Sequence, residues 1–228
     1  MTDIKTMMQV FQVCDSTFPI GTFNHSFGME NYLFERKIKK ASQFKMWIES
    51  YFHSQYRYGE GLLTLLCHDA SLEDILTYDD IITQSTLAKE TREGTKMIAR
   101  QMYILIQKMY GDTFSLLNSY VAKIENEQAY GNPAIIFSLF AYALGLSPQE
   151  VFTMYGYSIV STLVQNGVRS IPLGQREGQV ILHELITLID KLYHEVATYD
   201  EELLGANAPG LELAQIRHEV QAARLFMS

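Results

Sequence analysis

Residues 147–170 read SPQEVFTMYGYSIVSTLVQNGVRS, and this stretch carries the clearest helix signal in the sequence. Ser147 has the side chain of a helix N-cap, Pro148 suits the first helical position, and Glu150 can reach back to the cap. Apolar residues then recur every three or four positions, as in an α-helix: Val151, Phe152, Tyr155, Ile159, Val160, Leu163 and Val164. The spacing predicts a long helix that ends where Ile171-Pro-Leu-Gly174 interrupts the pattern.

The same period extends over most of the chain on both sides of this stretch. Helical spacing occurs over residues 42–58, 87–110, 114–124, 134–145 and 175–193 and from Leu211 to about Ala223, and Ser71 opens a further segment in the style of a capping box. Glycine and proline interrupt the pattern between these segments, and alternating strand patterns are nearly absent. The sequence therefore predicts an all-α protein, with residues 1–228 in a single, bundle-like domain of roughly ten helices.

Composition and charge narrow the classes of function. Hydrophobic residues make up 47% of the 228, which is enough for one sizeable core. The 26 acidic and 18 basic residues give a formal net charge of −8, which disfavours a nucleic-acid binder. We find no signal-peptide pattern, and the longest apolar block, 134–146, is too short to span a bilayer. Two cysteines are too few for a disulfide framework, so we expect a reduced, cytoplasmic protein.

The segment 14–31, CDSTFPIGTFNHSFGMEN, gathers the side chains of a candidate catalytic site. Asp15, Ser16 and His25 could form a hydrolase triad, because such triads are defined by geometry and not by spacing. No G-x-S-x-G elbow surrounds either serine, however, and no strand precedes them. A structural interpretation explains the same residues: Asp15 or Ser16 closes the first helix, and Ser26 caps the next one. The hydrolase stays open as an alternative.

Strong metal-binding and phosphate-binding motifs are absent from the sequence. The six histidines form no H-E-x-x-H motif and the two cysteines no C-x-x-C motif. Cys67 and His68 are neighbours, but on a helix their side chains point about 100° apart and do not readily chelate one ion. Gly94-Thr-Lys96 lacks the upstream glycine of a Walker-type phosphate loop. A metal-binding protein that uses histidine and cysteine stays open as a second alternative.

The chain ends in residue types that anchor protein interfaces. Residues 216–228 read IRHEVQAARLFMS, with Arg224 and Phe226 close to the end. Chain ends are usually frayed and polar, whereas arginine and aromatic side chains are typical interface anchors. Residues 211–228 are therefore predicted to be a docking tail, held either by their own domain or by a partner protein.

Five ordered segments resemble the urease accessory protein F family, UreF. Asp15 to Glu30 resembles the family pattern D-S-x-F-P-x-G-x-x-x-H-S-x-G-x-E, and residues 88–92 resemble A-x-E-x-R. Asn132-Pro133 precedes a buried helix as in the family. Residues 169–179 resemble R-x-x-P-L-G-Q-x-x-x-Q, and residues 217–228 resemble R-H-E-x-Q-x-x-R-L-F-x-S. Together the segments are spread over nearly the whole chain.

This resemblance implies an all-α, dimer-forming protein without catalysis or a bound cofactor of its own. Proteins of the family assemble with UreD (also called UreH) and the GTPase UreG, and the complex inserts nickel into apo-urease. The resemblance thus implies a chaperone or scaffold that bridges UreD and UreG and couples GTP hydrolysis to metal transfer. A nickel-binding protein and a hydrolase are the alternatives, and neither nucleic acid nor a membrane is an expected partner.

The same segments supply the residues expected to contact partners, and none is assigned as a catalytic residue or a metal ligand. They are Asp15, Ser16, Pro19, Gly21, His25, Ser26, Glu30, Arg92, Arg169, Pro172, Gly174, Gln175, Arg217, His218, Glu219, Arg224 and Phe226.

Overall fold

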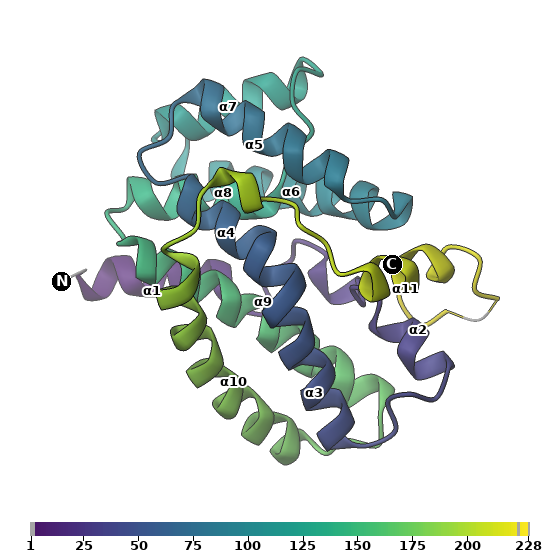
Figure 1. The fold of residues 1–228 in the computed structure, drawn as a ribbon. Helices are drawn as coiled ribbons and strands as arrows, with labels where there is room; N and C mark the ends of the chain where they lie inside the picture. Colours follow the sequence, from purple (N-terminus) through teal and green to yellow (C-terminus); the bar gives the residue numbers. More distant parts are fainter. Residues whose placement is uncertain (1–2, 223, 228) are drawn as a thin grey trace.

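A computed structural model describes residues 3–222 and 224–227, and over these residues the backbone forms eleven α-helices and no strand (Figure 1). The helices are α1 (Ile4–Cys14), α2 (Met29–Phe34), α3 (Ala41–Tyr51), α4 (Glu60–Leu66), α5 (Leu72–Ser85), α6 (Lys89–Tyr110), α7 (Ser115–Glu125), α8 (Pro133–Ala143), α9 (Pro148–Ser170), α10 (Gln175–Val196) and α11 (Pro209–His218). Two short 3₁₀ turns, η1 (Thr22–Asn24) and η3 (Glu201–Leu203), and one π turn, η2 (Phe52–Tyr56), complete the regular structure. The all-α prediction is confirmed.

The long helix predicted from residues 147–170 is α9, and it organises the core. The Ser147 hydroxyl accepts a hydrogen bond from the amide of Glu150, and the Glu150 carboxylate accepts one from the amide of Ser147 at 2.8 Å, so the predicted capping box is present. α9 is buried over most of its length and packs against α10, α4, α8 and α1. Its position therefore determines where four other helices lie.

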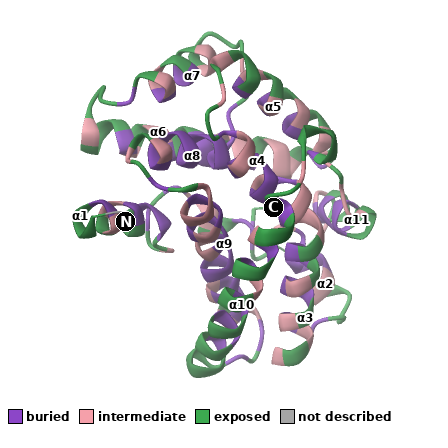
Figure 2. Cartoon of the chain, turned by 60° about the vertical axis from the view of Figure 1, so that its left-hand side comes forward, coloured by how far each residue is buried: buried purple, intermediate pink, exposed green. Residues whose placement is uncertain are grey.

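α8 is the most apolar helix and lies beside α9 in the interior, where Figure 2 shows it buried along nearly its whole length. Its N-terminus is capped by Asn132, whose side-chain oxygen accepts a hydrogen bond from the amide of Ala134 at 2.8 Å. None of the helices within the described residues is both long and apolar enough to cross a membrane.

Two predicted helices have different ends in the structure. The helical run predicted over 42–58 begins at Ala41 and continues through the π turn toward α4, where the Tyr56 hydroxyl donates a hydrogen bond to the Phe152 carbonyl of α9 at 2.6 Å. The last helix ends at His218, well before Ala223, because the chain turns back onto the domain there. Ala223 itself, like Ser228, lies outside the described residues.

α3 and α9 approach each other closely at Gly167. A Cβ atom added to Gly167 would lie 2.3 Å from Cζ of Phe44, a ring that is completely buried between the two helices. Interiors are packed too tightly for such a ring to move without cost. Glycine is therefore required at this position for the helices to keep their distance.

We expect Gly167→Ala to lower the free energy of unfolding by about 2 kcal/mol, because the added methyl group overpacks the Phe44 ring. The matched control is Gly210→Ala in α11, where the nearest atom to the added Cβ is the Tyr32 hydroxyl at 3.5 Å, an ordinary contact. Urea unfolding of both variants measures the difference. Equal stability of the two variants would show that α3 and α9 do not approach at Gly167.

Candidate functional site

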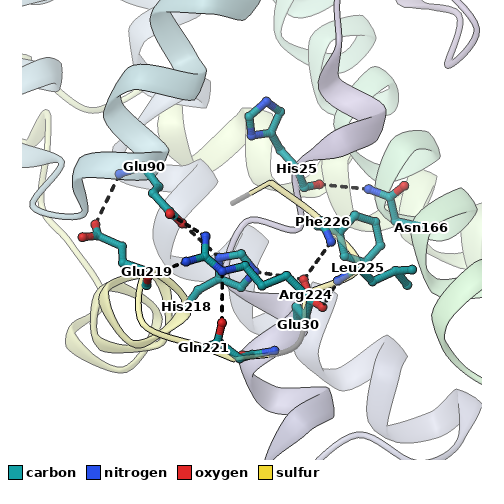
Figure 3. A network of polar contacts seen from close by, with 10 residues as sticks. All are labelled: His25, Glu30, Glu90, Asn166, His218, Glu219, Gln221, Arg224, Leu225 and Phe226. Carbon is teal, nitrogen blue, oxygen red and sulfur yellow. Dashed lines mark hydrogen bonds and ion pairs between the residues drawn. The ribbon is translucent and has the colours of Figure 1, made fainter.

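Segments from both ends of the chain meet at one side of the molecule. α11 packs against α2 and against α6, and the described C-terminal residue lies beside them (Figure 1). Four of the five segments singled out in the sequence contribute side chains here: the loop before α2, the start of α6, the end of α9 and the C-terminal tail that follows α11. Figure 3 shows the polar contacts that join them.

Glu30 of α2 is the centre of this network. The amides of Leu225 and Phe226 donate hydrogen bonds to its carboxylate, that of Phe226 at 2.9 Å, and Nε2 of His218 lies 2.9 Å from the same carboxylate. Glu30 is only 7% exposed, so these three donors replace the water that a buried carboxylate would otherwise need. The carboxylate thereby holds the tail against α2.

His218 of α11 lies between two carboxylates. Its ring is fully buried, with Nε2 toward Glu30 and Nδ1 3.2 Å from Oε2 of Glu90 on α6. Both ring nitrogens therefore lie within hydrogen-bond distance of a carboxylate oxygen. The pair of contacts links three helices through one side chain.

Glu90 is also the anchor for Arg224. The Arg224 guanidinium donates to Oε1 of Glu90 at 2.6 Å and to the Glu219 carbonyl. Burial acts to raise the pKa of Glu90, but the hydrogen bonds and charges of Arg224 and His218 outweigh it and lower that pKa. The lowered pKa favours the ionised form of Glu90, whose carboxylate contacts both the Arg224 guanidinium and the His218 ring.

The loop before α2 is held by contacts to α9 and α6. Asn166 of α9 donates a hydrogen bond to the His25 carbonyl at 2.9 Å. The His25 ring lies against Gly94 of α6, where an added Cβ would be 2.5 Å from Cε1 of the ring. Burial lowers the pKa of His25, which favours its neutral form. Gly94 leaves the space that this ring occupies.

The outer edge of the site is an exposed patch of mixed arginine and apolar character. The Arg169 guanidinium lies 3.7 Å from the ring centroid of Phe23 and 5.5 Å from that of Phe226. The Met227 amide donates to the Asn24 carbonyl at 2.7 Å, which fastens the tail beside the loop. Phe23, Leu225 and Met227 are 43%, 57% and 55% exposed. We call Phe23, Arg169, Leu225 and Met227 the tail patch.

The structure does not assemble the hydrolase triad. The Asp15 carboxylate is exposed and accepts hydrogen bonds from the amide and hydroxyl of Thr17, at 2.7 and 2.6 Å, so it closes the turn after α1 as the structural interpretation predicts. Among the described residues, no hydrogen bond or ion pair joins Asp15 or Ser16 to His25.

The predicted role of Ser26 as a helix cap is wrong. α2 begins at Met29, and its N-cap is Gly28, which takes a positive φ of 86°. Ser26 lies two residues earlier and is fully buried, and its hydroxyl has no hydrogen-bond partner among the residues that the structure describes. The left-handed turn at Gly28 separates the serine from the helix end that it was expected to cap.

Metal ligands are not grouped in the part of the chain that the structure describes. There, no three side chains of His, Cys, Asp or Glu lie where they could together hold a metal ion. Cys14 and Cys67 are both buried, and burial raises the pKa of each thiol, which disfavours the thiolate form that binds metals.

The other residues expected to contact partners take several positions. Arg92 donates to the Thr86 carbonyl at 2.8 Å and holds the connection between α5 and α6, and Arg217 pairs with Glu35 on the surface at 3.1 Å. Exposed residues in turns form a second group: Pro19, Pro172, Gly174 and, at the start of α10, Gln175. Gly21 takes a left-handed φ of 92° in the loop. Five predicted contact residues are instead buried within the chain: His25, Ser26, Glu30, His218 and Phe226.

Comparison with known proteins identifies the family. The UreF family model matches residues 38–186. The protein named urease accessory protein UreF from Streptococcus salivarius (strain 57.I) is 48% identical over 99% of this chain and 96% of its own length. Proteins of the same name from Bacillus sp. (strain TB-90) and Lachnoclostridium phytofermentans are 38% and 36% identical over 99% and 97% of this chain.

The chain belongs to the UreF family.

The family model covers the helical core, whereas the UreF relatives align over nearly the whole chain, including the segments that form the site. Within the segments that resemble the UreF patterns, buried residues such as Glu30 and His218 form the base of the site. Arg169, from the same segments, forms part of its exposed edge. The segments that look reactive in the sequence thus hold the tail in place.

A half-buried acidic residue lies next to this base. Glu60 lines a cavity of about 50 Å³ together with Phe27, Gln55 and Gln215, and it accepts a hydrogen bond from the Tyr155 hydroxyl at 3.2 Å. Burial raises the pKa of Glu60 to about 7, although the Tyr155 hydrogen bond acts in the opposite direction. The folded chain therefore binds this proton more tightly than the unfolded chain, in which the pKa is about 4.5.

Because the folded-state pKa of Glu60 is raised, its contribution to stability is lost as the pH rises from about 4.5 to about 7. We expect Glu60→Gln to gain stability relative to the wild type between pH 5 and pH 8, as followed by thermal unfolding. Glu125→Gln, at an exposed position of α7, is the control and should show no such trend. A stability difference for Glu60→Gln that stays constant with pH would contradict the assignment.

We expect Glu30→Gln to lower the free energy of unfolding by about 3 kcal/mol, because it removes the charge that faces buried His218 and the tail amides. The control is Glu35→Gln, at the C-cap of α2, which breaks only surface ion pairs with Arg217 and Lys37 and should cost clearly less. Urea unfolding and the rate of tryptic cleavage after Arg224 report stability and tail release. Equal values for both variants would show that Glu30 does not hold the tail.

Proposed function

We propose that the chain is a non-catalytic scaffold of urease maturation that bridges UreD (UreH) and the GTPase UreG for GTP-dependent insertion of nickel into apo-urease. The family and the name of its relatives, urease accessory protein, support the general role. The observation that carries the bridging role is the tail patch, which presents exposed apolar side chains around an arginine on a rigid base. Such a composition is typical of protein interfaces.

The tail patch is the proposed contact for UreD, and UreG joins through that assembly. Arg224 and Phe226 fix the patch to the domain. Arg224 binds Glu90, and Phe226 is 4% exposed, with its ring beside Arg169. They set the position of Leu225 and Met227, which are exposed. A docked tail favours binding, because the segment is ordered before the partner arrives.

Further parts of the proposal follow from the family resemblance. The protein forms a two-fold dimer, the commonest symmetry of soluble oligomers. It works in the cytoplasm, binds no nucleotide or other cofactor, and couples GTP hydrolysis by UreG to the transfer of nickel. Light scattering of the purified chain at micromolar concentration tests the dimer, and calorimetry with nickel tests whether the chain itself binds the metal.

We expect the double variant Leu225→Ser, Met227→Ser to weaken binding to UreD about tenfold or more, because exposed apolar anchors are lost from the centre of the contact. Its unfolding midpoint should stay close to that of the wild type, since both side chains are more than half exposed. The matched control is Val180→Ser, Ile186→Ser on α10, where the side chains are 57% and 45% exposed.

Pull-down and binding curves with purified UreD and UreG give the measurement. If the wild-type chain binds neither protein, the scaffold function is wrong. If the wild type binds and the Leu225, Met227 variant binds equally well, the contact lies away from the tail patch.

A further inference from the structure

α6 has an exposed face that the fold does not use. Residues at intervals of three or four positions share one side of a helix. Six exposed residues of α6 follow such intervals, and we call them the α6 strip: Lys89, Glu93, Met97, Arg100, Ile104 and Lys108. The strip runs for about 28 Å, nearly the full length of the helix.

The charge of the α6 strip is opposite to that of the whole protein. Lys89, Arg100 and Lys108 form no ion pair with any described residue. The one acid of the strip, Glu93, is neutralised by Lys96, whose Nζ lies 2.8 Å from its carboxylate. The strip is therefore a row of free cations on a chain whose net charge is −8.

Apolar side chains lie between these cations. Met97 and Ile104 are 51% and 41% exposed, whereas Ile98 and Met102 on the opposite side of α6 are buried toward the core, where α6 packs against α8. The packing of α6 against the rest of the domain therefore uses only its buried side. Exposed apolar groups flanked by unpaired cations form the pattern of an interface that combines burial with electrostatic attraction.

We propose that the α6 strip is a second docking surface, which binds an acidic, partly apolar face of a protein partner. A symmetric, strip-to-strip contact between two copies of this chain does not fit, because it would bring like charges together. The proposal rests on the scaffold function, since a protein that bridges two partners needs two contact surfaces. The tail patch provides one, and the α6 strip provides the other.

α6 connects the two surfaces physically. Glu90, in the first turn of α6, binds His218 and Arg224 of the tail, and the strip begins one residue earlier at Lys89. One continuous helix of 22 residues thus carries the base of the tail patch at its start and the strip along its outer side. The scaffold holds its two partners at a fixed distance from each other.

The test is charge reversal along the strip in the full-length chain: Lys89→Glu, Arg100→Glu, Lys108→Glu. The matched control is Lys39→Glu, Lys40→Glu, Lys191→Glu, which changes the net charge equally at three exposed lysines that are not on α6 and form no ion pair with described residues. Binding of each variant to purified UreD and to purified UreG is measured at low and at physiological salt, and circular dichroism confirms that each variant is folded.

The strip variant should bind one of the two partners about tenfold more weakly than the wild type, with a smaller dependence on salt, whereas the control should bind both nearly as the wild type does. Wild-type affinity of the strip variant for both partners would overturn the docking surface and leave the scaffold function standing. Failure of the wild type to bind either partner would overturn both. Loss of binding to phosphatidylglycerol vesicles, with partner affinities unchanged, would assign the strip to a lipid surface instead.

Discussion

A carboxylate buried in the interior must be matched by donors, and the candidate site is built around one such carboxylate, that of Glu30. Its partners are three groups near the end of the chain, the ring of His218 and the amides of Leu225 and Phe226, which lie 188 to 196 residues away in the sequence. Because these donors are lost if the tail leaves, the charge of Glu30 ties the end of the chain to its beginning. The position of Phe226 in the core and of Leu225 on the surface both depend on this tie.

This arrangement explains why the segment 14–31 looks like an active site without assembling one. His25, Ser26 and Glu30 are buried; the His25 carbonyl holds the loop to α9, the Glu30 carboxylate holds the tail to α2, and Asp15 closes a turn at the surface. The side chains that face solvent at the same place are Phe23 and Arg169, with Leu225 and Met227 from the tail. A polar interior under an exposed apolar edge suits a protein that presents a surface to a partner.

Local sequence signals predicted where most of the helices lie. The features of the site that the sequence did not predict depend on contacts between residues far apart in the chain. The capping boxes at Ser147 and Ser71 and the period of α6 are local, so they were visible in the sequence and are present in the structure. The cap expected at Ser26 failed because the left-handed turn at Gly28 starts the helix later. The importance of Glu90 was missed, since an acid in the first turn of a helix is ordinary until His218 and Arg224 are seen beside it. The sequence left open whether the tail is held by its own domain or by a partner, and among the described tail residues Arg224, Leu225 and Phe226 contact their own domain.

The most direct test of this account is the hydrogen exchange of the tail amides in the wild-type chain, measured residue by residue by NMR in the absence of any partner. If Glu30 holds the tail, the amides of Leu225, Phe226 and Met227 should exchange slowly, with protection comparable to that of α11. Exchange of these three amides at the rate of an unstructured chain end would contradict it.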